Sequence, residues 1–119
     1  MNVSVLVVDD EADIRGLARR ILIGCGLDVV GEADSVAAGA AAAASLKPDA
    51  ILVDVMLPDG NGIALARRLA GLPWKPRIVV TSSDDDAAEG HDLGSAGVVA
   101  FVPKEDLPSA PLDRLLGGP

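Results

Sequence analysis

The stretch Ile51-Leu52-Val53-Asp54-Val55-Met56-Leu57-Pro58-Asp59-Gly60-Asn61-Gly62 decides the fold of this chain. An apolar run ends there on one carboxylate, and Pro, Gly and Asn residues typical of a turn follow at once. A single Asp in such a place is normally a turn former or a helix cap. Three other apolar runs end in the same way, on Asp9-Asp10, on Thr81 and on Lys104. Polar side chains after several buried strands indicate one site at the edge of a sheet.

Apolar runs alternate with helical patterns along the whole chain. The patterns predict strands at residues 3–8, 27–31, 50–53, 77–80 and 98–102, and helices at residues 11–25, 36–46, 62–70, 84–96 and 111–116. Ser35 is expected to cap the second helix, whereas Gly90 and Gly94 weaken the fourth. This alternation predicts an α/β fold with a parallel sheet, helices on both faces and right-handed connections. The 119 residues suit a single domain.

Composition argues against several classes of protein. The formal net charge of −8 argues against nucleic-acid binding by this domain, because phosphate contacts need clustered Lys and Arg. We expect no association with a membrane, since no apolar run has the length of a membrane span. The N-terminus lacks the pattern of a signal peptide, and Cys25 is the only cysteine, so the sequence predicts a reducing, cytoplasmic setting.

The polar residues at the predicted strand ends suit phosphoryl chemistry. Asp9, Asp10 and Asp54 would repel one another unless a cation neutralised them, and their oxygen ligands favour Mg²⁺, or Mn²⁺ in its place. Lys104 adds a mobile positive charge and Thr81 a hydroxyl, both able to bind a phosphoryl oxygen. The predicted reaction is phosphoryl transfer to the carboxylate of Asp54, which gives an acyl phosphate.

Taken together, these residues resemble the receiver domain of bacterial two-component response regulators. The resemblance covers residues 1–119 and rests on Asp9-Asp10, the run from Asp54 to Gly62, Thr81, Phe101 and Lys104. It implies a doubly wound, flavodoxin-like sheet of five parallel strands in the order 2-1-3-4-5. In that order the first and third strands are neighbours, so their carboxylates converge. The resemblance also implies one receiver domain, with any output domain outside this chain.

The resemblance assigns the acidic residues their roles. Asp54 would be the phosphoacceptor. Asp10 and Asp54 would bind Mg²⁺ directly, together with the backbone carbonyl of Met56, and Asp9 would bind it largely through water.

The resemblance also implies a switch. Thr81 and Lys104 would bind the phosphoryl group, and the rotamer of Phe101 would follow Thr81. Phosphorylation would then shift the face formed by the fourth predicted helix, the fifth strand and the last helix between two packings. The alternative for Phe101 is an ordinary core aromatic.

A sensor histidine kinase is the implied partner, with partner choice located around Arg15, Arg19 and Glu105. A homodimer through the switching face is a further option. The domain would be a signalling module and not an enzyme, although it would catalyse its own phosphorylation and dephosphorylation. We favour a DNA-binding output domain outside this chain. The alternatives are a stand-alone regulator and a degenerate receiver that acts only as a protein-binding module.

The chain departs from the family pattern after Lys104, where the family usually has Pro, often with a cis bond, and Glu105 stands here. Because a cis non-proline bond costs about 2.5–4 kcal/mol, the alternatives are a trans bond and a strained cis bond.

Two other classes of protein fit this sequence less well than a receiver. A phosphatase of the aspartyl-phosphate type would carry a second Asp at the position of Met56, and a nucleotide-binding module would need a Gly-rich loop after the first strand.

Overall fold

A five-stranded parallel sheet forms the centre of the computed structural model, which describes residues 2–84, 93–95 and 97–117. Its strands are β1 (Ser4–Val8), β2 (Asp28–Ala33), β3 (Ala50–Asp54), β6 (Arg77–Ser82) and β7 (Val98–Pro103). They lie in the order β2-β1-β3-β6-β7. The predicted order is confirmed, because the two short strands β4 (Met56–Leu57) and β5 (Gly60–Asn61) form a separate hairpin.

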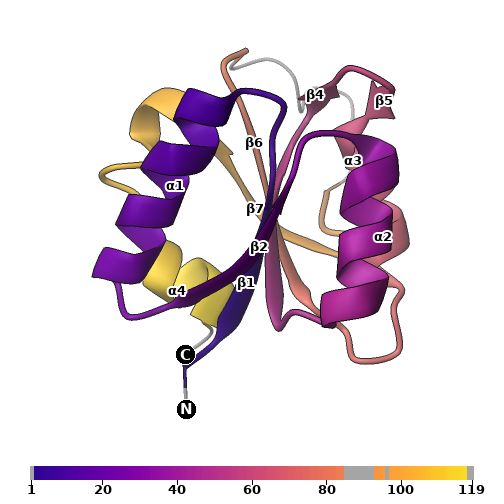
Figure 1. Cartoon of the computed structure of the whole chain (residues 1–119), viewed down its shortest axis with the longest axis horizontal. Coiled ribbons are helices and arrows are strands. Elements are labelled where there is room, and N and C mark those ends of the chain that lie inside the picture. Colours follow the sequence, from indigo (N-terminus) through magenta and orange to yellow (C-terminus); the bar gives the residue numbers. More distant parts are fainter. Residues whose placement is uncertain (1, 85–92, 96, 118–119) are drawn as a thin grey trace.

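Helices cover both faces of the sheet. The helices α1 (Ala12–Gly24) and α4 (Leu112–Gly117) lie on one face, and α2 (Val36–Leu46) and α3 (Gly62–Ala70) lie on the other (Figure 1). A short 3-10 helix, η1 (Lys104–Asp106), follows β7. The helix predicted at residues 84–96 falls mostly outside the described residues, and residues 93–95 form a turn. No helix in the described part of the chain has the length and apolarity of a membrane span.

The middle positions of the three central strands are all apolar because each of these strands packs against helices on both sides. In β1, Leu6 and Val8 belong to the core cluster on the α2 and α3 side, whereas Val5 and Val7 belong to the cluster on the α1 and α4 side. The Ala-rich α2 packs closely on the sheet, since a Cβ on Gly39 would lie only 3.1 Å from Cγ1 of Val8. The small side chains of α2 therefore set the distance between this helix and the sheet.

The N-terminus of α2 is capped as predicted. The side chain of Ser35 accepts a hydrogen bond from the backbone N–H of Ala38 at 3.0 Å. The carboxylate of Asp59, in the hairpin turn, accepts two more, from the backbone N–H groups of Val36 at 2.7 Å and Ala37 at 3.1 Å. The turn that follows β3 is thus attached to α2.

Both edge strands carry a bulge. The register with β1 passes from Val29 to Gly31, which leaves Val30 as an extra residue in β2. The register with β6 likewise passes from Val98 to Ala100, which leaves Val99 as an extra residue in β7. Each bulged valine is exposed. Bulges of this kind disrupt regular pairing at a free edge and so oppose growth of the sheet by edge-to-edge association.

The carboxyl ends of the strands meet at one edge of the sheet, where the β4–β5 hairpin also lies (Figure 1). Asp54, the last residue of β3, is the register partner of Thr81 in β6. The backbone N–H of Val55 donates to the carbonyl of Thr81 at 2.9 Å. Thr81 therefore belongs to β6, whereas the sequence placed it just beyond the strand. This is the edge that positions the candidate site.

Candidate functional site

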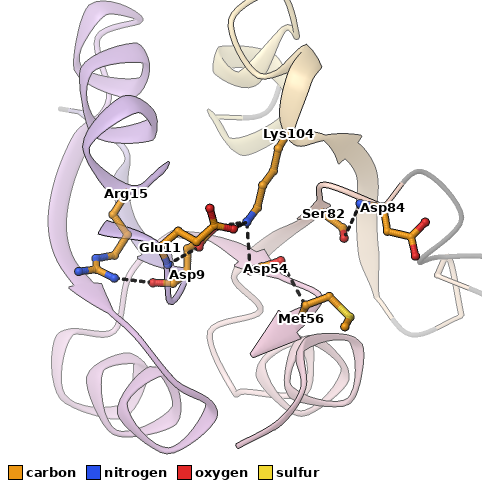
Figure 2. A network of polar contacts seen from close by, with 8 residues as sticks. All are labelled: Asp9, Glu11, Arg15, Asp54, Met56, Ser82, Asp84 and Lys104. Carbon is orange, nitrogen blue, oxygen red and sulfur yellow. Dashed lines mark hydrogen bonds and ion pairs between the residues drawn. The ribbon is translucent and has the colours of Figure 1, made fainter. Parts of the chain in front are cut away.

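Asp9 follows β1 directly and is held from several directions. Its backbone N–H donates to the carbonyl of Ala33 at 2.9 Å, and its own carbonyl accepts from Nη1 of Arg15 at 2.7 Å. Its Oδ1 accepts from the backbone N–H of Glu11 at 2.8 Å. Its Oδ2 lies 3.1 Å from Nζ of Lys104, at ion-pair distance but without the alignment of a hydrogen bond. These contacts hold the buried side chain toward the site (Figure 2).

Asp54 is buried at the end of β3. Its Oδ1 accepts from the backbone N–H of Met56 at 3.1 Å, and its Oδ2 accepts from Nζ of Lys104 at 3.2 Å. The backbone of Asp54 lies against the start of α3. A Cβ on Gly62 would lie 1.8 Å from the carbonyl oxygen of Asp54, so only glycine fits there. Gly62 is thus the residue that lets α3 begin beside Asp54.

Lys104 brings its ammonium group into contact with three carboxylates. Its Nζ lies 2.9 Å from Oε1 of Glu11, 3.1 Å from Oδ2 of Asp9 and 3.2 Å from Oδ2 of Asp54 (Figure 2). The side chain is buried although it carries a charge, and its three acidic partners make that burial tolerable. The described part of the chain has no cis peptide bond, so the bond between Lys104 and Glu105 is trans.

Burial and charge perturb the protonation of these groups. Burial, and then the nearby charge of Asp9, raise the pKa of Asp54 to about 6. Burial likewise raises the pKa of Asp9. For Lys104, burial on its own lowers the pKa, but the hydrogen bond that it donates to Glu11 and the negative charges of Asp9 and Asp54 outweigh burial, so the pKa lies above its ordinary value. The site therefore has more negative charge than Lys104 alone offsets.

This surplus suits a metal cation. Asp9, Asp10, Glu11 and Asp54 each offer a carboxylate oxygen, and these oxygens all lie within 4.8 Å of one another. An all-oxygen set without His or Cys fits Mg²⁺ or Mn²⁺. Asp10 is exposed, and a ligand role for the carbonyl of Met56 stays a prediction. The sequence analysis missed Glu11, although it continues the Asp9-Asp10 run at the start of a helix.

Thr81 and Phe101 are placed differently. Thr81 is buried, and its Oγ1 has no hydrogen-bond partner among the described residues. Since buried polar groups are normally satisfied, this hydroxyl beside Asp54 is available for a ligand oxygen. Phe101 is half-buried against the core cluster on the α2 and α3 side, and its role in a switch stays a prediction.

The family model for the response regulator receiver domain matches residues 5–112. This chain belongs to the response regulator receiver family. Its acidic cluster, Lys104 and Thr81 therefore lie in a receiver domain. The receiver is also similar to the solved response regulator domain of CheB from Thermotoga maritima, at 28% identity and a TM-score of 0.77, which covers 96% of this chain and 87% of that one.

Three curated relatives differ in length and in kind. The receiver is 36% identical over 103 residues to a protein-glutamate methylesterase/protein-glutamine glutaminase of Burkholderia thailandensis, which covers 82% of this chain and 29% of the relative. It is 41% identical over 105 residues to the DNA-binding transcriptional activator DevR/DosR of Mycobacterium tuberculosis, with 87% and 48% covered. It is 30% identical over 115 residues to the chemotaxis protein CheY of Thermotoga maritima, with 97% and 96% covered. The chain thus spans less than half of the first two relatives.

Proposed function

We propose that this receiver accepts a phosphoryl group on Asp54 from the phosphohistidine of a sensor histidine kinase, in a reaction that depends on Mg²⁺. One observation carries the proposal. The carboxylate of Asp54 lies 3.2 Å from Nζ of Lys104, inside a cluster of carboxylates, and the strand beside it presents the unpartnered hydroxyl of Thr81. The proposed nucleophile, the proposed cation ligands and the two groups proposed to bind the phosphoryl group thus lie close together, which supports the proposal.

Each residue has a definite task in this reaction. An oxygen of Asp54 attacks phosphorus, the phosphorus–nitrogen bond of phosphohistidine breaks, and the imidazole leaves with the bonding electron pair and takes up a proton. Asp54 has to be ionised for this step, and a pKa of about 6 leaves it mostly ionised at neutral pH. When bound, Mg²⁺ would offset the charge of the phosphoryl oxygens. Lys104 and Thr81 would then bind the transferred group, which gives their buried polar atoms a common ligand.

The output of this event is part of the proposal. A phosphoryl group adds up to two negative charges, which would draw Thr81 and Lys104 inward and change the packing of Phe101. We favour a DNA-binding output domain under this control, a proposal supported by the similarity to DevR/DosR. The similarity to CheY over nearly its full length supports a stand-alone regulator as the second candidate. The reading frame beyond codon 119 distinguishes these two outcomes.

The decisive experiment is intact mass spectrometry after incubation with acetyl phosphate and Mg²⁺ at pH 7.5. We expect one phosphoryl adduct on the wild-type chain, which hydroxylamine removes, and none on Asp54→Asn. Asp59→Asn is the matched control, because it makes the same chemical change at an exposed carboxylate that contacts α2 instead of Lys104, and it should keep the adduct. An adduct that persists on Asp54→Asn would place the acceptor elsewhere. No adduct on the wild type would favour a degenerate receiver that only binds proteins.

A further inference from the structure

Arg15, near the start of α1, points inward. Its Nη1 donates to the backbone carbonyl of Asp9 at 2.7 Å, and its Nε donates to Oε1 of Glu32 on β2 at 3.1 Å. The side chain is only 20% exposed, and Figure 2 shows it turned toward Asp9. A guanidinium group can bind two partners at fixed angles, so Arg15 ties the end of β1 to the neighbouring strand.

The segment that Arg15 holds supplies most of the cation site. Asp9, Asp10 and Glu11 are consecutive, and together they provide three of the four clustered carboxylates. Two backbone contacts of Asp9 anchor this turn from outside, one to Ala33 and one to Arg15. A shift of the Asp9 carbonyl would therefore move all three carboxylates relative to Asp54.

We infer that Arg15 is a positioning residue for the cation site. Its bond to the Asp9 carbonyl sets the turn that presents Asp9, Asp10 and Glu11, and the ion pair with Glu32 holds Arg15 in the orientation that makes this bond. The inference rests on the proposed function, because it assumes that the carboxylate cluster binds Mg²⁺.

The direction in which Mg²⁺ affinity changes when Arg15 is replaced distinguishes a positioning role from a purely electrostatic one. Arg15 carries a positive charge, so it repels a nearby cation, and loss of the charge alone would tighten Mg²⁺ binding. Loss of a positioning contact acts in the opposite direction, and groups that orient metal ligands typically change metal affinity by about 10–100-fold. Weaker binding on removal of a positive charge has no purely electrostatic explanation.

The test is calorimetric titration of the whole chain with MgCl₂. We expect Arg15→Gln to weaken Mg²⁺ binding by about tenfold. Arg19→Gln is the matched control, because Arg19 is on the same helix and pairs with the same Glu32 at 3.4 Å but forms no hydrogen bond or ion pair with Asp9 in the described structure. We expect Arg19→Gln to leave the affinity unchanged or slightly higher. Arg15→Lys should be intermediate, since an ammonium group lacks the fork that reaches both partners.

Further variants separate this inference from the proposed function. Asp54→Asn should weaken Mg²⁺ binding whatever Arg15 does. A wild-type chain that does not bind Mg²⁺ overturns both proposals. A different outcome overturns only the role of Arg15. In that outcome the wild type binds Mg²⁺ and Asp54→Asn binds it more weakly, but Arg15→Gln and Arg19→Gln bind it equally well. Should Arg15→Gln fail to fold, Arg15→Lys and Arg19→Lys make the same comparison, and equal affinities in that pair overturn the inference.

Discussion

The replacement of Asp54 by Asn should stabilise the metal-free receiver. The pKa of Asp54 lies at about 6 in the folded chain against an ordinary value of 3.8, so the folded state disfavours the ionised carboxylate even beside Lys104. That rise corresponds to at most about 3 kcal/mol of lost stability at neutral pH. Asn has almost the same shape and no charge, so Asp54→Asn should recover about 1–3 kcal/mol of the free energy of unfolding.

The pH dependence has a definite sign. Between about pH 4 and pH 6 Asp54 is more protonated in the folded than in the unfolded chain, so the contribution of this carboxyl group to stability falls as the pH rises through this window. Asp54→Asn lacks this group, and its advantage over the wild type should disappear near pH 4. Asp59→Asn is the control of opposite sign, because hydrogen bonds from the backbone N–H groups of Val36 and Ala37 lower the pKa of Asp59. The folded state favours the ionised form of Asp59, so that variant should be less stable than the wild type.

The measurement is urea unfolding at pH 7.5 and pH 4, in EDTA and in Mg²⁺. For a slope of roughly 1–3 kcal/mol per molar urea, the midpoint of Asp54→Asn should rise by about 1 M at pH 7.5 in EDTA. Mg²⁺ should stabilise the wild type more than the variant, since it binds the folded cluster. An Asp54→Asn midpoint below that of the wild type in EDTA would refute the reasoning, because the ion pair with Lys104 would then outweigh the burial of the carboxylate.

Three further substitutions test the packing and the charges around the site by the same unfolding assay. Lys104→Met should destabilise the chain by about 3 kcal/mol at pH 7.5, because it leaves buried carboxylates without the ammonium group that pairs with them. This loss of stability should be smaller at pH 5, where more of the carboxylates are protonated. An equal loss at both pH values would contradict this explanation. Gly62→Ala should cost roughly 2–4 kcal/mol because its Cβ would overlap the carbonyl of Asp54, whereas Gly71→Ala, with 3.4 Å of clearance, should cost far less. Ser35→Ala should cost about 1 kcal/mol through loss of the cap on α2, and an unchanged midpoint would mean that Asp59 alone caps this helix.

Local patterns predicted most of the architecture. Continuous β-branched runs marked the strands because a sheet covered on both faces needs apolar side chains at every position. Ser35 marked a helix start because its hydroxyl satisfies a free backbone N–H. The β4–β5 hairpin was missed, since two paired residues on each side of the Pro58-Asp59 turn leave no periodic pattern. The bulges at Val30 and Val99 were missed too, because register between strands is not a local property.

The sequence by itself predicted most of the groups that the candidate site contains. Asp9, Asp54, Thr81 and Lys104 could be found because side chains at the carboxyl ends of parallel strands meet at one edge. Only the tertiary structure decided how these groups interact. It showed Lys104 shared among three carboxylates, Glu11 as the third of them, and the trans bond after Lys104. It also turned Arg15, which the sequence placed on a docking surface, toward the carbonyl of Asp9. Contacts between residues far apart in the chain depend on side-chain direction and packing, which no local pattern encodes.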